Sequence, residues 1–168
     1  MEKKKIINII IIVLILVSVL VVYFIKNREV EEVGAEKDFY MAVTEKLDTE
    51  KLKEYKLPII ISFGSEGCPA CVKMKPYLRQ LNTELKGKAI IKYLDVWKYP
   101  EYGEGYNFEY IPTQVFITKD GKPYENKNIK DITFEYEKDS NGKILYTYHV
   151  GYLSYDDLKR ILKELNNE

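Results

Sequence analysis

The chain opens with one long apolar run. Residues 6–25 are almost entirely apolar, and a helix of that length would span about 30 Å, the thickness of the hydrocarbon core of a bilayer. A helix buried in a soluble protein is rarely apolar on every face for so long. We therefore predict a transmembrane anchor over 6–25, with a short tail over 1–5 before it and a charged linker over 26–37 after it.

A cleaved signal peptide is the alternative reading of this run. Its apolar region would usually be shorter and would end at a small-residue cleavage site, whereas this run ends in Val-Val-Tyr-Phe-Ile. An uncleaved anchor is therefore favoured. Lysines at 3–5 precede the run, and only Lys26 and Arg28 follow it closely, so the positive-inside rule predicts a cytoplasmic amino terminus and an extracytoplasmic carboxyl-terminal domain.

In residues 38–168, short apolar segments alternate with polar ones, as is typical of a globular domain. Residues 58–63 form a continuous apolar run, typical of a central strand that is covered on both faces. Further patterns predict strands over 39–43, 89–96 and 113–118, helices over 48–55, 68–85 and 154–165, and a hairpin over 129–150. The hairpin prediction depends on Asn141-Gly142, which lies between two β-rich runs. Alternating strands and helices predict an α/β fold with helices against a sheet.

Charge and cysteine content narrow the function. Lys plus Arg and Asp plus Glu both total 26, so no net charge attracts nucleic acid, and we expect no nucleic-acid partner. The chain has two cysteines, Cys68 and Cys71. Such a pair closes almost no loop and would add little stability as a disulfide. Its value is therefore expected to be chemical.

The sequence Cys68-Pro69-Ala70-Cys71 follows the central strand and begins a predicted helix. Cys68 would then lie at the helix amino terminus, where the helix dipole and free amides favour its thiolate, the nucleophile in disulfide exchange. Cys71, one turn further on, could attack the mixed disulfide and release the substrate. Pro69 suits the first turn, where an amide proton is not needed.

Two other readings of the cysteine pair are less favoured. A structural zinc site needs four ligands, and His149 is the only other histidine or cysteine in the chain. A non-redox local disulfide would stabilise little because its loop is so short.

The wider pattern resembles the thioredoxin family. A strand, a Cys-x-x-Cys motif, a helix containing Pro76, another strand and then Ile111-Pro112-Thr113 occur in that order. The resemblance covers about residues 39–165. It is supported at further family positions by Tyr106, Asp120-Gly121 and Val150-Gly151.

The resemblance implies a central mixed sheet flanked by helices and a cis Ile111–Pro112 bond beside the cysteines. It assigns substrate binding to Pro69, Ile111, Pro112 and Thr113, with the backbone before the proline pairing with a substrate strand. The implied substrates are proteins with disulfides or dithiols, together with a membrane redox partner. No metal and no bound cofactor is implied, because the Cys68–Cys71 disulfide carries the electrons.

Three features depart from the family pattern. Gly67 stands where thioredoxins usually have tryptophan, and Ser62 stands where they usually bury an aspartate as a proton acceptor. Proton transfer from Cys71 would then use water or Glu66, although Glu66 also fits a solvated loop carboxylate. The hairpin over 129–150 is extra length, which would form either a partner-binding edge or an elongated sheet, and the elongated sheet is favoured. Trp97 follows a strand at the cysteine end and is a candidate for the rim of the substrate groove.

The predicted function is a membrane-anchored thiol-disulfide oxidoreductase that exchanges disulfides with exported proteins. The alternative is a non-catalytic, membrane-tethered adaptor of thioredoxin-like fold. A soluble cytoplasmic reductase is disfavoured by the apolar run at 6–25.

Overall fold

The computed structural model describes residues 8, 13–22, 36–106 and 109–166. The chain divides into two compact units, Met1–Asp38 and Phe39–Glu168. In the first unit, residues 13–22 are helical, with their apolar side chains exposed. Within the described residues, no helix has both the length and the apolar character that crossing a bilayer requires. The tail over 1–5, both ends of the predicted anchor and most of the linker lie outside the described residues.

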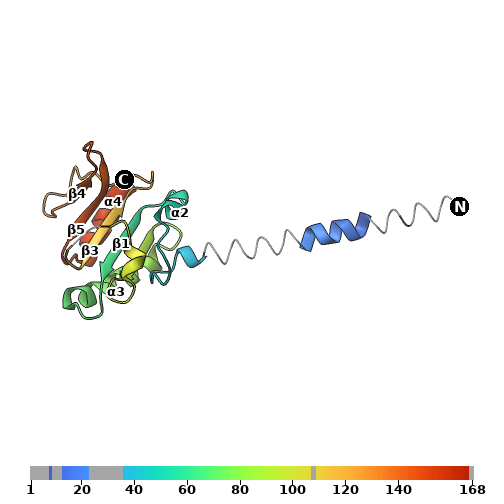
Figure 1. The fold of residues 1–168 in the computed structure, drawn as a ribbon, viewed down its shortest axis with the longest axis horizontal. Coiled ribbons are helices and arrows are strands. Elements are labelled where there is room, and N and C mark those ends of the chain that lie inside the picture. Colours follow the sequence, from blue (N-terminus) through green and yellow to red (C-terminus); the bar gives the residue numbers. More distant parts are fainter. Residues whose placement is uncertain (1–7, 9–12, 23–35, 107–108, 167–168) are drawn as a thin grey trace. The chain divides into compact units, whose positions relative to one another are not determined.

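The second unit is built on a five-stranded mixed sheet in the order β2-β1-β3-β5-β4 (Figure 1). β1 pairs with β2 in parallel, and the other neighbouring strands are antiparallel. The strands are β1 (Ile59–Gly64), β2 (Ile90–Asp95), β3 (Thr113–Ile117), β4 (Glu135–Lys138) and β5 (Ile144–Val150). The helices are α2 (Thr49–Glu54), α3 (Pro69–Glu84), the 3-10 helix η1 (Pro100–Gly103) and α4 (Tyr155–Leu165).

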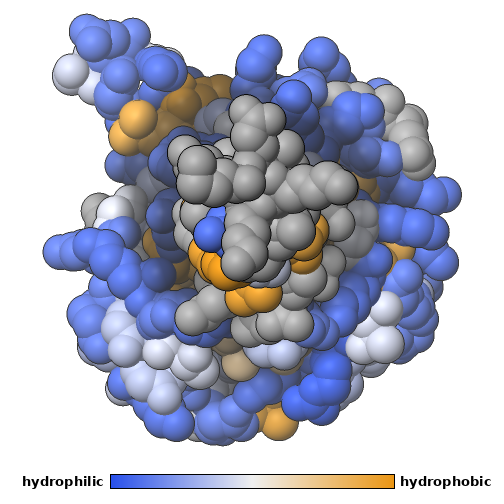
Figure 2. Space-filling view, turned by 90° about the vertical axis from the view of Figure 1, so that its right-hand side faces the viewer, coloured by the Kyte–Doolittle hydropathy of each residue, from blue (hydrophilic) through white to orange (hydrophobic). Residues whose placement is uncertain are grey.

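β1 lies between two apolar layers. All its residues are buried. Ile60 belongs to the core cluster formed with α3 and α4, whereas Ile61 and Phe63 belong to the cluster on the opposite side, with residues of α2 and β3. This explains why the run is apolar except for Ser62, because side chains of a strand alternate between two faces that are both covered. Polar and charged residues dominate the surface visible in Figure 2.

The sequence at the start of α3 favours a helix. Cys68 is the N-cap, and its Sγ accepts a hydrogen bond from the backbone N–H of Cys71 at 3.2 Å. Pro69 occupies the first turn, where the lack of an N–H leaves no bond unmade. The buried stripe consists of Cys71, Met74, Leu78 and Leu81. Pro76 lies inside α3 without ending it.

The predicted strand over 39–43 was wrong. Only an isolated bridge joins Ala42 to Tyr93, with hydrogen bonds from Tyr93 N to Met41 O and from Val43 N to Tyr93 O. The carbonyl of Tyr40 accepts a hydrogen bond from Lys92 Nζ at 2.8 Å. The segment therefore pairs with β2 at a single bridge and forms no strand.

The predicted hairpin is present over β4 and β5, but residues 129–134 are not a strand. In its turn, Asp139 Oδ1 accepts hydrogen bonds from the N–H groups of Asn141 and Lys143, and Gly142 has a φ of +79°. Ile129 and Ile132 are instead buried in the core. β4 is an edge of the sheet, with a register shift between Glu137 and Lys138.

The amino terminus of α4 provides a stability test. Ser154 and Asp157 form a reciprocal capping box, with the Ser154 Oγ accepting from Asp157 N at 3.2 Å. Replacing Ser154 by Ala should lower the free energy of unfolding by about 1 kcal/mol, measured by urea denaturation of the full chain. Ser140→Ala, in the exposed hairpin turn, should change it by less than about 0.5 kcal/mol. Equal losses in the two variants would contradict the capping role.

Candidate active site

The two cysteines lie at the junction of β1 and α3 and form a disulfide, with their Cα atoms 5.2 Å apart. Their surroundings differ. Cys68 is partly exposed, whereas Cys71 has no exposed surface. A second protein could therefore reach the sulfur of Cys68 but not that of Cys71.

The loop before β3 faces Cys68 across the site. The Ile111–Pro112 peptide bond is cis, and the Ile111 carbonyl oxygen lies 3.8 Å from Cys68 Sγ. The Pro112 carbonyl accepts a hydrogen bond from Gly151 N at 2.8 Å, which ties the loop to the end of β5. This loop is therefore fixed in place next to the disulfide.

The predicted substrate-binding residues Pro69, Ile111 and Thr113 differ in how far they are exposed to solvent. Pro69 is exposed at the start of α3, and Ile111 is partly exposed. Thr113 is fully buried, and its Oγ1 donates to the carbonyl of Tyr110 at 2.6 Å. Its side chain therefore braces the loop from inside.

Trp97 lies against Gly67, the residue before Cys68. A Cβ atom at Gly67 would collide with the indole ring, and the indole is still 69% exposed. The backbone N–H groups of Trp97 and Lys98 both donate to Asp95 Oδ1 at 3.1 Å, which fixes the turn that carries the indole. The structure thus brings a tryptophan to the position next to Cys68 from the end of β2, although the residue before Cys68 is glycine.

Glu66 forms an exposed ion pair with Lys75. The Lys75 ammonium also lies 4.6 Å from the centroid of the Tyr93 ring. The carboxylate therefore belongs to a surface interaction with the first turns of α3. The proton-transfer role that the sequence suggested for Glu66 stays a prediction.

Sequence reasoning did not single out Tyr93, which lies close to Cys71. Both the Tyr93 hydroxyl and the Cys71 Cβ lie within 3.1 Å of the point that a Gly64 Cβ would occupy. Burial, followed by the negative charges of Asp95 and Glu66, raises the pKa of Tyr93 to about 12. The signal available in the sequence was weak, because it required the register that sets Tyr93 opposite Ser62.

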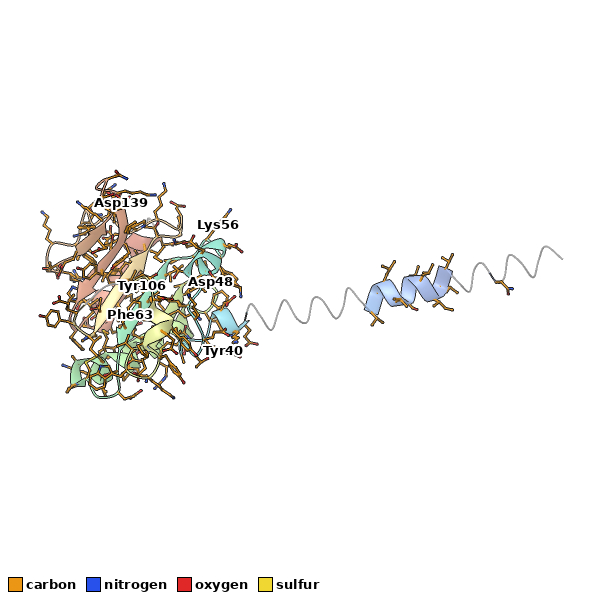
Figure 3. The ribbon with its side chains drawn as sticks, in the orientation of Figure 1. Tyr40, Asp48, Lys56, Phe63, Tyr106 and Asp139 are labelled. Atoms are coloured by element: carbon orange, nitrogen blue, oxygen red, sulfur yellow. A yellow bond between two sulfur atoms is a disulfide. The ribbon has the colours of Figure 1, made fainter. Side chains whose placement is uncertain are left out.

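The end of β1 is supported from the opposite face of the sheet. The rings of Phe63 and Tyr106 have centroids 5.1 Å apart (Figure 3). The hydroxyl groups of Tyr106 and Thr49 are 3.0 Å apart, which connects this packing to α2. The strand that leads into the cysteines is therefore held by an aromatic contact beneath it.

Within the described part of the chain, no three His, Cys, Asp or Glu side chains are grouped so that they could hold a metal ion. His149 lies on β5, where its Nδ1 is 2.8 Å from the Thr133 carbonyl oxygen. This contact places it on the hairpin side of the sheet.

The sequence of the chain is similar to those of known thioredoxins. The thioredoxin family model matches residues 40–135. A thioredoxin of Rickettsia bellii is 27% identical over 85 residues, which cover 51% of this chain and 80% of that protein. A thioredoxin of Chlorobaculum thiosulfatiphilum is 32% identical over 84 residues, covering 50% and 76%. The X-ray structure of Fasciola hepatica thioredoxin aligns with a TM-score of 0.48 at 21% identity, covering 70% of this chain and 90% of that one.

The mixed sheet, its flanking helices and the disulfide at the start of α3 define a redox protein of α/β fold. The family match covers more than half of the chain, and the chain belongs to the thioredoxin family. It is a thioredoxin-like redox protein whose cysteine pair is Cys68–Cys71.

The contact between Gly67 and Trp97 can be tested by fluorescence, because Trp97 is the only tryptophan. The added methyl group of Gly67→Ala should displace the indole from the backbone and make its emission more accessible to acrylamide. Gly105→Ala is the control. Its φ of +97° disfavours alanine, but the new Cβ would meet nothing within 4 Å. If Gly67→Ala leaves the quenching unchanged, the indole does not pack on Gly67.

Proposed function

We propose that this protein is a membrane-anchored thiol-disulfide oxidoreductase that exchanges disulfides with exported proteins. The observation that carries the proposal is the asymmetry of the cysteine pair. Cys68 is reachable at a helix start, 3.8 Å from the Ile111 carbonyl, and Cys71 is sealed behind it. Membership of the thioredoxin family supports the same chemistry.

Exchange proceeds in two balanced steps. The Cys68 thiolate attacks a substrate disulfide, forms a mixed disulfide and releases one substrate sulfur as a thiolate. The Cys71 thiolate then attacks Cys68 Sγ, which forms the Cys68–Cys71 disulfide and releases the second substrate sulfur. The two protons that the cysteines lose are taken up by the released substrate thiolates or by solvent. The same steps in reverse oxidise a substrate dithiol.

The site stabilises the attacking thiolate through the start of α3. The Cys71 N–H donates to Cys68 Sγ at 3.2 Å, and the positive end of the helix dipole lies at the same sulfur. Both interactions favour the charged over the protonated form of Cys68. The pKa of its thiol is therefore expected to lie below the usual value for cysteine.

Protein substrates fit the surroundings of Cys68 better than small thiols. The partly exposed Ile111 offers backbone groups to an extended substrate segment beside the cis proline. Exposed apolar side chains lie next to the cysteine motif and in the loop before β3. Val72 follows Cys71, Trp97 covers Gly67, and Tyr110 precedes Ile111. The substrate class is therefore an unfolded or extended protein segment that carries a cysteine.

The proposed location rests on the sequence of the first unit. The apolar run over 6–25, with lysines before it, supports a single membrane span with a cytoplasmic amino terminus. The domain would then work outside the cytoplasm, where protein disulfides persist. A membrane redox partner would restore the working redox state of the cysteine pair.

Trapping variants distinguish an enzyme from an adaptor. In full-length Cys71→Ser, Cys68 should remain joined to its substrates, because no second sulfur releases them. These adducts are detected as thiol-sensitive bands on non-reducing gels. Cys68→Ser is the matched control and should form none, since Cys71 is buried. If neither variant forms adducts and the wild-type chain fails to reduce a disulfide-bonded test protein with dithiothreitol, the non-catalytic adaptor is the better description.

Membrane attachment and orientation can be measured together. The full chain should sediment with membranes, and deletion of residues 1–25 should move it to the soluble fraction. In intact cells treated first with a membrane-impermeant phosphine reductant, which frees Cys68 from its adducts, a membrane-impermeant maleimide should label Cys68 in the Cys71→Ser variant. Labelling that appears only after lysis would place the domain on the cytoplasmic side and would contradict the proposed orientation.

A further inference from the structure

Buried hydroxyl groups gather behind the disulfide. Ser62 and Ser65 are fully buried and Tyr93 is 4% exposed, and none of their hydroxyls forms a hydrogen bond with any described residue. An unsatisfied buried hydroxyl destabilises a fold by about 1–3 kcal/mol. Such groups are rare in native proteins and call for a physical reason.

The backbone places two of these hydroxyls on the face of the sheet that carries Cys71. Ile60 packs into the core with α3 and with Tyr93. Ser62 and Gly64 follow at steps of two along β1 and therefore lie on the same face. Ser62 and Tyr93 are direct partners in the parallel ladder.

Gly64 lets the Tyr93 hydroxyl approach Cys71. The point that a Cβ would occupy on Gly64 lies 2.8 Å from the Tyr93 hydroxyl and 3.1 Å from the Cys71 Cβ. Any side chain at Gly64 would fill the space between them. The hydroxyl therefore lies no more than about 6 Å from the Cys71 Cβ, and it has no described residue as its hydrogen-bond partner.

The charges around Tyr93 decide what its hydroxyl can do. Lys75 lies over the ring from α3, Glu66 pairs with Lys75 from the loop before α3, and Asp95 ends β2. Because burial raises the pKa of Tyr93 to about 12, the phenol keeps its proton at neutral pH. It is a hydrogen-bond donor there and not a base.

We propose that Tyr93 is the positioning residue of the resolving step, donating a hydrogen bond from its hydroxyl to the Cys71 thiolate. This inference rests on the proposed function and assigns its second step. Burial alone disfavours a thiolate, and a donor to the charged form offsets that effect. Cys71 loses its proton to the released substrate thiolate or to solvent, attacks Cys68 Sγ, and the bond from Cys68 to the substrate breaks. Tyr93 remains protonated throughout. In the reverse direction, it stabilises the Cys71 thiolate as the leaving group.

The pKa of Cys71 tests the hydrogen bond directly. In a Cys68→Ser chain, Cys71 is the only thiol, so its titration is the difference in ultraviolet absorbance between this chain and a matched chain in which Cys71 is also Ser, which cancels the tyrosinate absorbance. Adding Tyr93→Phe, which keeps the ring under Lys75 and removes only the hydroxyl, should raise the pKa of Cys71 by about one to two units. The control is Tyr124→Phe, which removes a hydroxyl from a tyrosine that is also buried, 3% exposed, and bonded to Asn126. It should leave the titration unchanged.

Kinetics test the same role in the two-cysteine protein. The reduced full chain releases one coloured thiolate from an aromatic disulfide when Cys68 attacks and a second when Cys71 resolves the adduct. Tyr93→Phe should slow the second release about threefold to tenfold at neutral pH. A higher pKa leaves a smaller fraction of Cys71 as thiolate, and the greater nucleophilicity of that thiolate compensates only in part. The first release should not change, and the pH profile of the second should move to higher pH.

The outcomes separate the two proposals. If the wild-type chain releases both thiolates and Tyr93→Phe matches it in titration and rate, exchange stands and the role of Tyr93 is overturned. Equal effects of Tyr124→Phe would also overturn it, since they would reflect general loosening of the core. If the wild-type chain never releases a second thiolate, the proposed function fails, while the titration still measures the effect of Tyr93 on Cys71.

Discussion

The approach of Cys68 Sγ to the Ile111 carbonyl is the contact on which the site depends. It joins segments 43 residues apart in the sequence, and each segment is held from a different direction. Cys68 is fixed because β1 is buried between two apolar layers and α3 begins at the cysteine itself. Ile111 is fixed because β3 pairs with β1 and the next carbonyl, that of Pro112, is bonded to Gly151. The sheet thus places the partly exposed Cys68 next to the partly exposed Ile111.

The difference between the two sulfurs follows from helix geometry. Cys68 is the N-cap and lies outside the helical stripe, while Cys71 is the first member of the stripe that continues through Met74 and Leu78. A separation of three residues therefore takes one sulfur from the surface into the core within a single turn. In the proposed exchange, the exposed sulfur meets the substrate and the buried one reacts only with its neighbour.

Elements with a local signal could be predicted from the sequence. β1 followed from an apolar run, α3 from a buried stripe behind Pro69, and α4 from the Ser154 cap and its apolar periodicity. Features set by distant parts of the chain could not be predicted in this way. The strand predicted over 39–43 was wrong because this segment pairs with β2, far along the chain, at only one bridge, Ala42 to Tyr93. The packing of Trp97 on Gly67 and the approach of Tyr93 to Cys71 depend on strand register and on glycines that leave space. No local pattern encodes either feature.

β4, the outer strand of the hairpin, is an edge to which a strand from another copy of the molecule could add. β4 has only four residues, three of them charged, and its pairing slips at Glu137 and Lys138. A short, charged and irregular margin is a poor template for adding a further strand. The extension of the sheet therefore need not promote intermolecular β-aggregation, which a longer and flatter apolar border would invite.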